Sequence, residues 1–112
     1  MNALKNKVQL VGNLGNTPEI IELKGGNKLA KLSIATHDKY KDNNGALIEE
    51  TQWHNVVAWG RVAEIAEKYL TKGREVCVNG KLSSRSYEDR EGRVKYITEV
   101  VCSDIYMIGK SA

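Results

Sequence analysis

Apolar and polar side chains alternate along several stretches of the chain. Alternation with a period of two, rich in β-branched and aromatic residues, is the sequence signal of a half-buried β-strand. It predicts five main strands, at residues 7–14, 27–36, 51–59, 75–82 and 94–101. In the second of these, Ala30, Leu32 and Ile34 share one face, which we expect to point into the core.

The third predicted strand, residues 51–59, carries apolar side chains on both faces. His54, Val56 and Ala58 share one face, and Trp53, Val57 and Trp59 share the other. Because Val56 and Ala58 already supply an apolar face for the core, we expect the face with the two tryptophans to point outward.

One segment has helical periodicity instead. In residues 61–70 the apolar side chains recur every three or four positions, which places them on one face of an α-helix. That face consists of Val62, Ile65, Ala66, Tyr69 and Leu70. We expect Tyr69 to be buried with this face and Gly73 to end the helix as a left-handed cap.

Turn-forming residues separate the predicted strands. The clusters Asp42–Gly45 and Asp89–Gly92 are typical of hairpin turns, and they interrupt the long polar segments 38–50 and 83–95. We therefore expect two hairpins with long loops that project from the body. Three strands, a helix and two strands predict one domain, residues 1–112, that is all-β with one helix. The five-stranded oligonucleotide/oligosaccharide-binding (OB) barrel has this order, and so do other small barrels.

Composition adds little to this picture. Of the 112 residues 41% are hydrophobic and 28% charged, as in ordinary globular domains, and the net charge of +3 is compatible with a polyanionic partner without requiring one. No segment has the apolar length of a membrane span or the pattern of a signal peptide, so we expect a cytoplasmic protein. Cys77 and Cys102 are expected to be reduced and in or near the core.

The residues that could support catalysis do not form a recognisable set. Glu49 and Glu50 are the only adjacent acidic pair, and on a strand they would point to opposite faces. His37 opens a polar segment, and His54 lies on a strand. We therefore expect no enzyme, no metal site and no cofactor. The alternatives from other classes are a small nuclease that uses Glu49, Glu50 and His54, and a purely structural oligomer that binds no nucleic acid.

The aromatic residues are more informative. Tyr69 and Tyr106 lie in apolar surroundings and are expected to pack there, whereas Tyr40 and Tyr87 lie in the polar hairpins among Lys and Arg. Together with Trp53 and Trp59, which stand six positions apart on one strand face, these two tyrosines predict a platform on which the bases of a single strand can stack.

At these residues the chain resembles the bacterial single-stranded DNA-binding proteins, the homotetrameric OB-fold kind, over nearly its whole length. The resemblance rests on segments that occur in the family's order. They are Leu-Val-Gly-Asn-Leu-Gly at 10–15, Thr-Gln-Trp-His at 51–54, Val-Asn-Gly-Lys-Leu at 78–82 and Tyr-Ile-Thr-Glu-Val at 96–100.

The resemblance implies a nucleoid-associated homotetramer that binds single-stranded DNA without sequence specificity in DNA replication, recombination and repair. It assigns base stacking to Tyr40, Trp53, Trp59 and Tyr87. It assigns phosphate contacts to Lys7, Arg61, Lys72 and Arg85, and a subunit contact to His54. The family's linker and acidic C-terminal tail, which recruit replication and repair proteins, are absent from this chain, so such partners would require a tail beyond it. The alternative within binding modules is a primosomal accessory OB-fold protein that acts mainly through replication-protein contacts.

Overall fold

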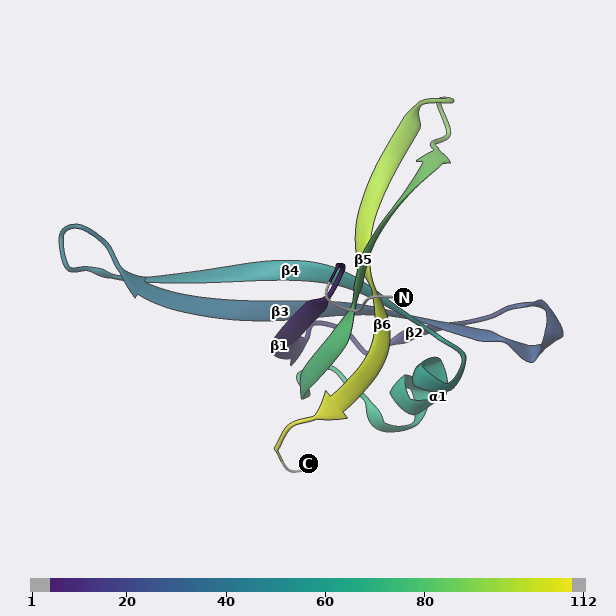
Figure 1. Cartoon of the computed structure of the whole chain (residues 1–112), viewed down its shortest axis with the longest axis horizontal. Coiled ribbons are helices and arrows are strands. Elements are labelled where there is room, and N and C mark those ends of the chain that lie inside the picture. Colours follow the sequence, from purple (N-terminus) through teal and green to yellow (C-terminus); the bar gives the residue numbers. More distant parts are fainter. Residues whose placement is uncertain (1–4, 110–112) are drawn as a thin grey trace.

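Six strands and one α-helix make up the part of the chain that the structure, a computed structural model, describes: residues 5–109 (Figure 1). In chain order the elements are β1 (Val8–Leu14), β2 (Glu19–Glu22), the short 3-10 turn η1 (Lys24–Gly26), β3 (Lys28–Lys41), β4 (Leu47–Trp59), α1 (Gly60–Tyr69), β5 (Glu75–Glu88) and β6 (Val94–Met107). The five predicted strands and the helix are confirmed. Strand β2 is a short addition at the edge of the sheet.

Five of the strands close into a barrel. The hydrogen-bonded order is β1-β5-β6-β4-β3-β2, and β1 also pairs with β3, which joins the two ends and leaves β2 outside the closed ring. Glycine permits this closure, because a Cβ at Gly12 would overlap the carbonyl group of Ala35 on β3. Gly80 has the same role where a bulge shifts the register of β5 against β6, since a Cβ there would overlap the carbonyl of Val101.

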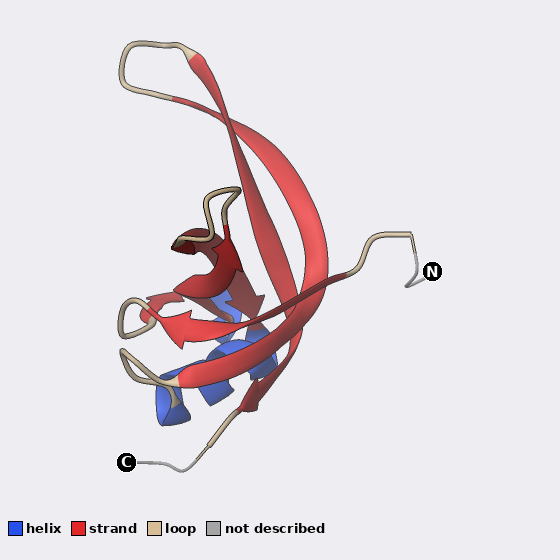
Figure 2. Cartoon of the chain, turned by 90° about the vertical axis from the view of Figure 1, so that its left-hand side faces the viewer, coloured by secondary structure: helices blue, strands red, loops and turns tan. Residues whose placement is uncertain are grey.

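The core fills the barrel and the space between the barrel and α1. Ala30, Leu32 and Ile34 are buried in it, as predicted, together with Val56 and Ala58 of β4. Helix α1 covers one end of the barrel, below the strands in Figure 2. The alternation of β3 and β4 therefore identifies the buried face correctly.

The buried stripe of α1 differs from the predicted one. Ala63, Ala66 and Leu70 are buried, whereas Tyr69 is 60% exposed, so the prediction that Tyr69 is a core residue is wrong. Two small alanines on the buried stripe leave no room for a tyrosine between helix and barrel. Gly73 is not the helix cap either, because Leu70 already has an extended backbone and Gly73 lies in the turn that follows.

Two hairpins project from the body in different directions, to the left and to the top of Figure 1. We call residues 36–52 the β3–β4 arm and residues 82–98 the β5–β6 arm. The predicted projection is confirmed, but the long loops are not, because the strands continue almost to each tip. At each tip an aspartate, Asp42 or Asp89, accepts two backbone N–H hydrogen bonds within a short turn. The arms raise the radius of gyration to 16.2 Å, compared with about 13 Å for a compact chain of this length.

The cysteines lie where they were expected. Both are free thiols, Cys102 is buried, and Cys77 is half-buried on the outside of the barrel. The prediction that Tyr106 packs in apolar surroundings is wrong for the single chain. Its register partner is Cys77, and its ring is largely exposed on the same outer surface. Within residues 5–109 no helix combines the length and the apolar character needed to cross a membrane.

Candidate nucleic-acid interface

Trp53 lies on the face of β4 that points away from the core. Val56 and Ala58, whose side chains point to the other face of β4, are fully buried, whereas Trp53 is 62% exposed. The six-membered ring of the indole lies against the backbone of Gly15, where a Cβ would overlap it. The outward orientation of the tryptophan face is thus confirmed, and Gly15 supports one side of the Trp53 ring.

Trp59, Tyr87 and Arg85 share that outer face. The strands β3, β4, β6 and β5 are neighbours in one sheet. Across these strands the register pairs are Lys31 with Val57, Val57 with Val101, and Arg85 with Ile97. All of these side chains point to the outer face of the sheet. Trp59, at the end of β4, is 50% exposed, and Tyr87 is similarly exposed two positions beyond Arg85. The structure therefore brings three of the four predicted stacking residues to one face.

Tyr40 is the exception. Its register partner is Ile48, and it points to the same face of β3 as the core residues of that strand. It therefore lies on the opposite face of the β3–β4 arm from Trp53. The Tyr40 hydroxyl donates a hydrogen bond to Glu50 Oε1 at 3.0 Å. This hydrogen bond, and repulsion between the two groups when both are charged, raise the pKa of Tyr40. The ring itself remains exposed.

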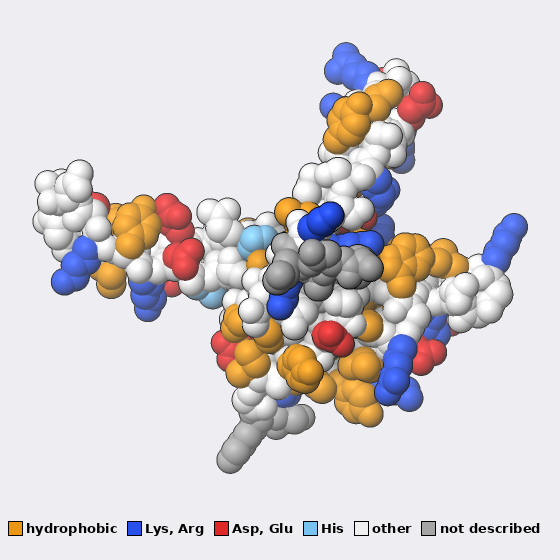
Figure 3. Space-filling view, in the orientation of Figure 1, with side chains coloured by type: hydrophobic (Ala, Val, Ile, Leu, Met, Phe, Trp, Pro, Cys, Tyr) orange, Lys and Arg blue, Asp and Glu red, His pale blue; other side chains and the backbone are white. Residues whose placement is uncertain are grey.

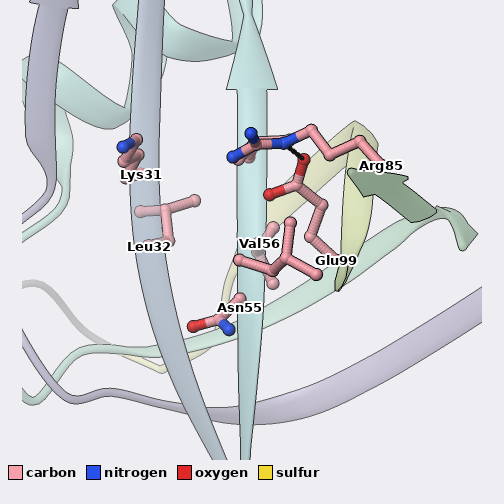
Figure 4. Close-up of a pocket in the computed structure, with 8 residues that line it drawn as sticks. Lys31, Leu32, Asn55, Val56, Arg85 and Glu99 are labelled. Atoms are coloured by element: carbon pink, nitrogen blue, oxygen red, sulfur yellow. Dashed lines mark hydrogen bonds and ion pairs between the residues drawn. The ribbon is translucent and has the colours of Figure 1, made fainter. Parts of the chain in front are cut away.

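A recess opens between the two arms on the outer face. Strands β4 and β6 pair over only three residues, Val56–Ala58 with Val100–Cys102, and the arms then diverge. The resulting hollow, of about 230 Å³, is drawn in Figure 4. Its polar lining residues come from four strands: Lys31, Asn55, Arg85 and Glu99.

An ion pair with one largely buried partner lies in this recess. Arg85 Nε donates to Glu99 Oε1 at 3.0 Å, and the Arg85 side chain is 52% exposed whereas the Glu99 side chain is only 10% exposed. Glu99 is not among the site residues predicted from the sequence. The available signal was an acidic residue within the apolar run of residues 97–102, on a strand whose other face is buried.

The remaining predicted phosphate contacts are exposed cations near the ends of elements. Lys7 directly precedes β1, Arg61 is in the first turn of α1, two residues after Trp59, and Lys72 lies in the turn between α1 and β5. Figure 3 shows basic side chains over the body and the arms, interspersed with hydrophobic groups. Arg85 differs from the other three cations because a buried carboxylate holds it.

The residues of the nuclease alternative are separated by the fold. Glu49 points to the outer face of β4, whereas Glu50 points to the opposite face and accepts the hydrogen bond of Tyr40. His54 is half-buried, and its Nε2 lies 3.0 Å from Thr36 Oγ1. Among residues 5–109 no three His, Cys, Asp or Glu side chains are grouped so that they could hold a metal ion.

Known proteins are similar to this chain in sequence. The model of the single-strand binding protein family matches residues 5–108. A protein named single-stranded DNA-binding protein 1 from Chlorobaculum tepidum is 47% identical over 105 residues, which are 93% of this chain and 65% of that protein. A protein of the same name from Xylella fastidiosa is 42% identical over 94% of this chain and 78% of its own length. The chain thus spans 65% of the length of the first relative and 78% of the length of the second.

Solved structures share its fold. The Plasmodium falciparum SSB in complex with ssDNA has a TM-score of 0.86 at 35% identity, over 93% of this chain and 95% of that one. A deletion mutant of the single-stranded DNA binding protein from Thermus aquaticus has a TM-score of 0.82 at 30% identity, over 93% of this chain and 50% of that one. These matches confirm the OB-fold prediction. The chain belongs to the single-strand binding protein family.

Proposed function

We propose that this protein binds single-stranded DNA without sequence specificity, by stacking bases on the aromatic rings of its outer face. The observation that carries this proposal is the exposure of Trp53 and Trp59 on one strand face, with Tyr87 and Arg85 on the same face across the recess. Exposed aromatic rings that are grouped on one face, rather than scattered singly, mark an interaction site. The likeness to a structure of an SSB with ssDNA supports the same reading.

The physical chemistry of this face fits a single strand better than a duplex. Each base stacked on an aromatic ring contributes about 1–3 kcal/mol, and every base has a π-face, so stacking does not select a sequence. The bases of a duplex are already stacked on each other and are not free to do this. Lys7, Arg61, Lys72 and Arg85 supply the cations that bind the phosphates.

Tyr40 has a separate place in this proposal. Because it lies on the opposite face of the β3–β4 arm, it stacks a base only where the strand passes around that arm. A nucleic acid that contacts both Trp53 and Tyr40 therefore follows a curved path. The projecting arms suit such wrapping.

We also propose that the protein works as a homotetramer. On the side away from β5, residues Val8–Gly12 of β1 have no strand partner among the described residues, and a free strand edge favours pairing with another chain. On the outside of the barrel, Val11, Cys77 and Tyr106 lie side by side on β1, β5 and β6 as an apolar row. These two features provide surfaces for association, and His54 is proposed as a subunit contact.

The proposed role is the protection of single strands in DNA replication, recombination and repair, in the cytoplasm at the nucleoid, without catalysis. The exposed stacking residues favour this role over that of a primosomal accessory protein. Competition for a fluorescein-labelled oligothymidine tests the binding. Unlabelled single strands of any composition are expected to displace the label, and duplex DNA of equal length is expected not to. Equal displacement by the duplex would contradict the proposal.

A further inference from the structure

We propose that the recess between the two arms binds a phosphodiester group of the DNA strand, with Lys31 and Arg85 as its cations and Glu99 as the residue that positions Arg85. This inference rests on the proposed binding of single-stranded DNA. It adds two residues, Lys31 and Glu99, to the interface.

The hydrogen bond to Glu99 leaves the phosphate-binding side of Arg85 free. A guanidinium carries five N–H donors in a rigid fork, and Glu99 engages only the Nε of Arg85. Figure 4 shows the terminal nitrogens of Arg85 pointing across the recess, toward the strand that carries Lys31. Two terminal N–H groups in one plane match two phosphate oxygens.

Burial makes Glu99 a fixed anchor. A carboxylate removed from water is costly unless a hydrogen-bonded cation compensates it, and Arg85 is the cation that pairs with it. The Glu99 side chain is largely buried, so it has little freedom to follow a moving arginine. The arginine is therefore held in one orientation before any DNA arrives, which lowers the entropy lost on binding.

Lys31 provides the second charge from the opposite wall. It is exposed on the outer face of β3, directly beside Val57 in the register with β4. Within residues 5–109 no ion pair of Lys31 is found, in contrast to Lys28, which contacts Glu67 at 2.6 Å. Lys31, Arg85 and Glu99 together leave a net charge of +1 in the recess, which favours an anion.

The position of the recess explains why a phosphate would be found there. Trp53 lies on the β4 side and Tyr87 on the β5 side of the same face. A strand whose bases stack on both rings must carry its backbone across the gap. The apolar walls formed by Val57 and Ile97 are suited to a sugar, and the cations to the phosphate next to it.

The first experiment measures the salt dependence of oligothymidine binding for Lys31→Ala. The plot of log affinity against log salt is expected to become less steep by about 0.7, the loss of one phosphate contact to a single strand. Lys68→Ala, which removes the same charge from the exposed side of α1, is the control and is expected to keep the wild-type slope. A wild-type slope for Lys31→Ala would overturn the assignment of Lys31.

The second experiment tests the positioning role with Glu99→Gln, which removes a negative charge near the DNA. If Glu99 positions Arg85, binding weakens about tenfold, the worth of one charge-assisted hydrogen bond, although the net charge has risen. In an Arg85→Ala background the same change is then expected to weaken binding no further, because there is no arginine left to position. Unchanged or tighter binding by Glu99→Gln would overturn the positioning role.

A third variant decides the matter if Glu99→Gln does not fold. Arg85→Lys keeps the charge, but a single ammonium nitrogen lacks the planar fork in which one nitrogen bonds the carboxylate and the two others face two phosphate oxygens. It is expected to bind as weakly as Arg85→Ala, and wild-type binding would overturn the proposal. If the wild-type protein did not bind oligothymidine at all, the proposed function itself would fail, so the two failures can be told apart.

Discussion

At the scale of the residue, the proposed platform depends on a contact that period-two alternation does not encode. Alternation places Trp53 on the outer face of β4, but only the fold shows that its ring lies against Gly15, a residue in the segment after β1. The two residues are 38 positions apart in the sequence. Sequence reasoning could identify the stacking residue but not the backbone that supports it.

Gly15→Ala is therefore expected to displace the Trp53 indole. The new methyl group would overlap the ring, so the ring must move or the strands must shift. We expect the tryptophan emission spectrum to change and oligothymidine binding to weaken, while the circular dichroism spectrum stays that of a folded barrel. Thr17→Ala, at a nearby exposed position, is the control. Wild-type emission and affinity for Gly15→Ala would show that the ring does not depend on this contact.

Cys102 carries a prediction about reactivity and pH. Burial, and to a smaller extent the charge of Asp104, raise the pKa of the Cys102 thiol from 9.0 to about 11. In the native protein the thiol thus stays neutral between pH 7 and pH 9, and the stability it contributes is lost only as the pH rises toward 11. Iodoacetamide labelling followed by mass spectrometry is expected to leave Cys102 unmodified until denaturant is added. Rapid native labelling at pH 8.5 would contradict its burial.

At the scale of the element, the strands were predictable and their faces largely so. Val56 and Ala58 could be assigned to the core because their alternation is regular, and the structure confirms it. The helix was less predictable, because helical periodicity does not say which of two adjacent stripes is buried, and Ala63 lies inside whereas Tyr69 lies outside. The face on which Tyr40 lies could not be predicted, because it follows from the register of the whole β3–β4 arm.

The arms are expected to serve binding rather than stability. No residue from 39 to 49 is buried, and Asp38 is the direct register partner of Glu50. Replacing residues 39–49 with Asn-Gly, a favoured two-residue hairpin turn, therefore shortens the arm without opening the core. The deleted segment has two lysines and two acidic residues, so the net charge is unchanged.

The shortened arm should melt near the wild-type temperature but bind oligothymidine about 5- to 150-fold more weakly, the worth of one stacked base, because Tyr40 is lost. Replacing only residues 42–46 keeps Tyr40 and is expected to preserve affinity. A large drop in melting temperature for the longer deletion would indicate that the arm stabilises the barrel.

At the scale of the whole molecule, sequence alone could not locate the association surfaces. Tyr106 looked like a packing residue because its neighbours are apolar, yet in the single chain it is exposed beside Cys77 and Val11. A second copy that covers this row would bury Tyr106, as its apolar sequence neighbours suggest. The free edge of β1 is likewise visible only once the sheet order is known.

If the protein is a homotetramer, light scattering at micromolar concentration is expected to give four times the mass of one chain. His54→Trp adds bulk to a half-buried position and is expected to shift the distribution toward smaller species, more strongly on dilution. Gln52→Trp, at a more exposed position on the same face of β4, is the control and is expected to behave as wild type. A monomeric wild-type protein at that concentration would refute the tetramer.

The most direct test of stacking on the outer face is the intrinsic fluorescence of the protein during titration with polythymidine. Trp53 and Trp59 are the only tryptophans, and both lie on the proposed surface, so stacked bases are expected to quench the emission in a saturable way. Duplex DNA is expected to have little effect. Trp53→Ala should weaken binding about 5- to 150-fold, and Trp53→Phe less. Unquenched emission, or wild-type binding by a Trp53→Ala variant that merely unfolds more easily, would contradict the account.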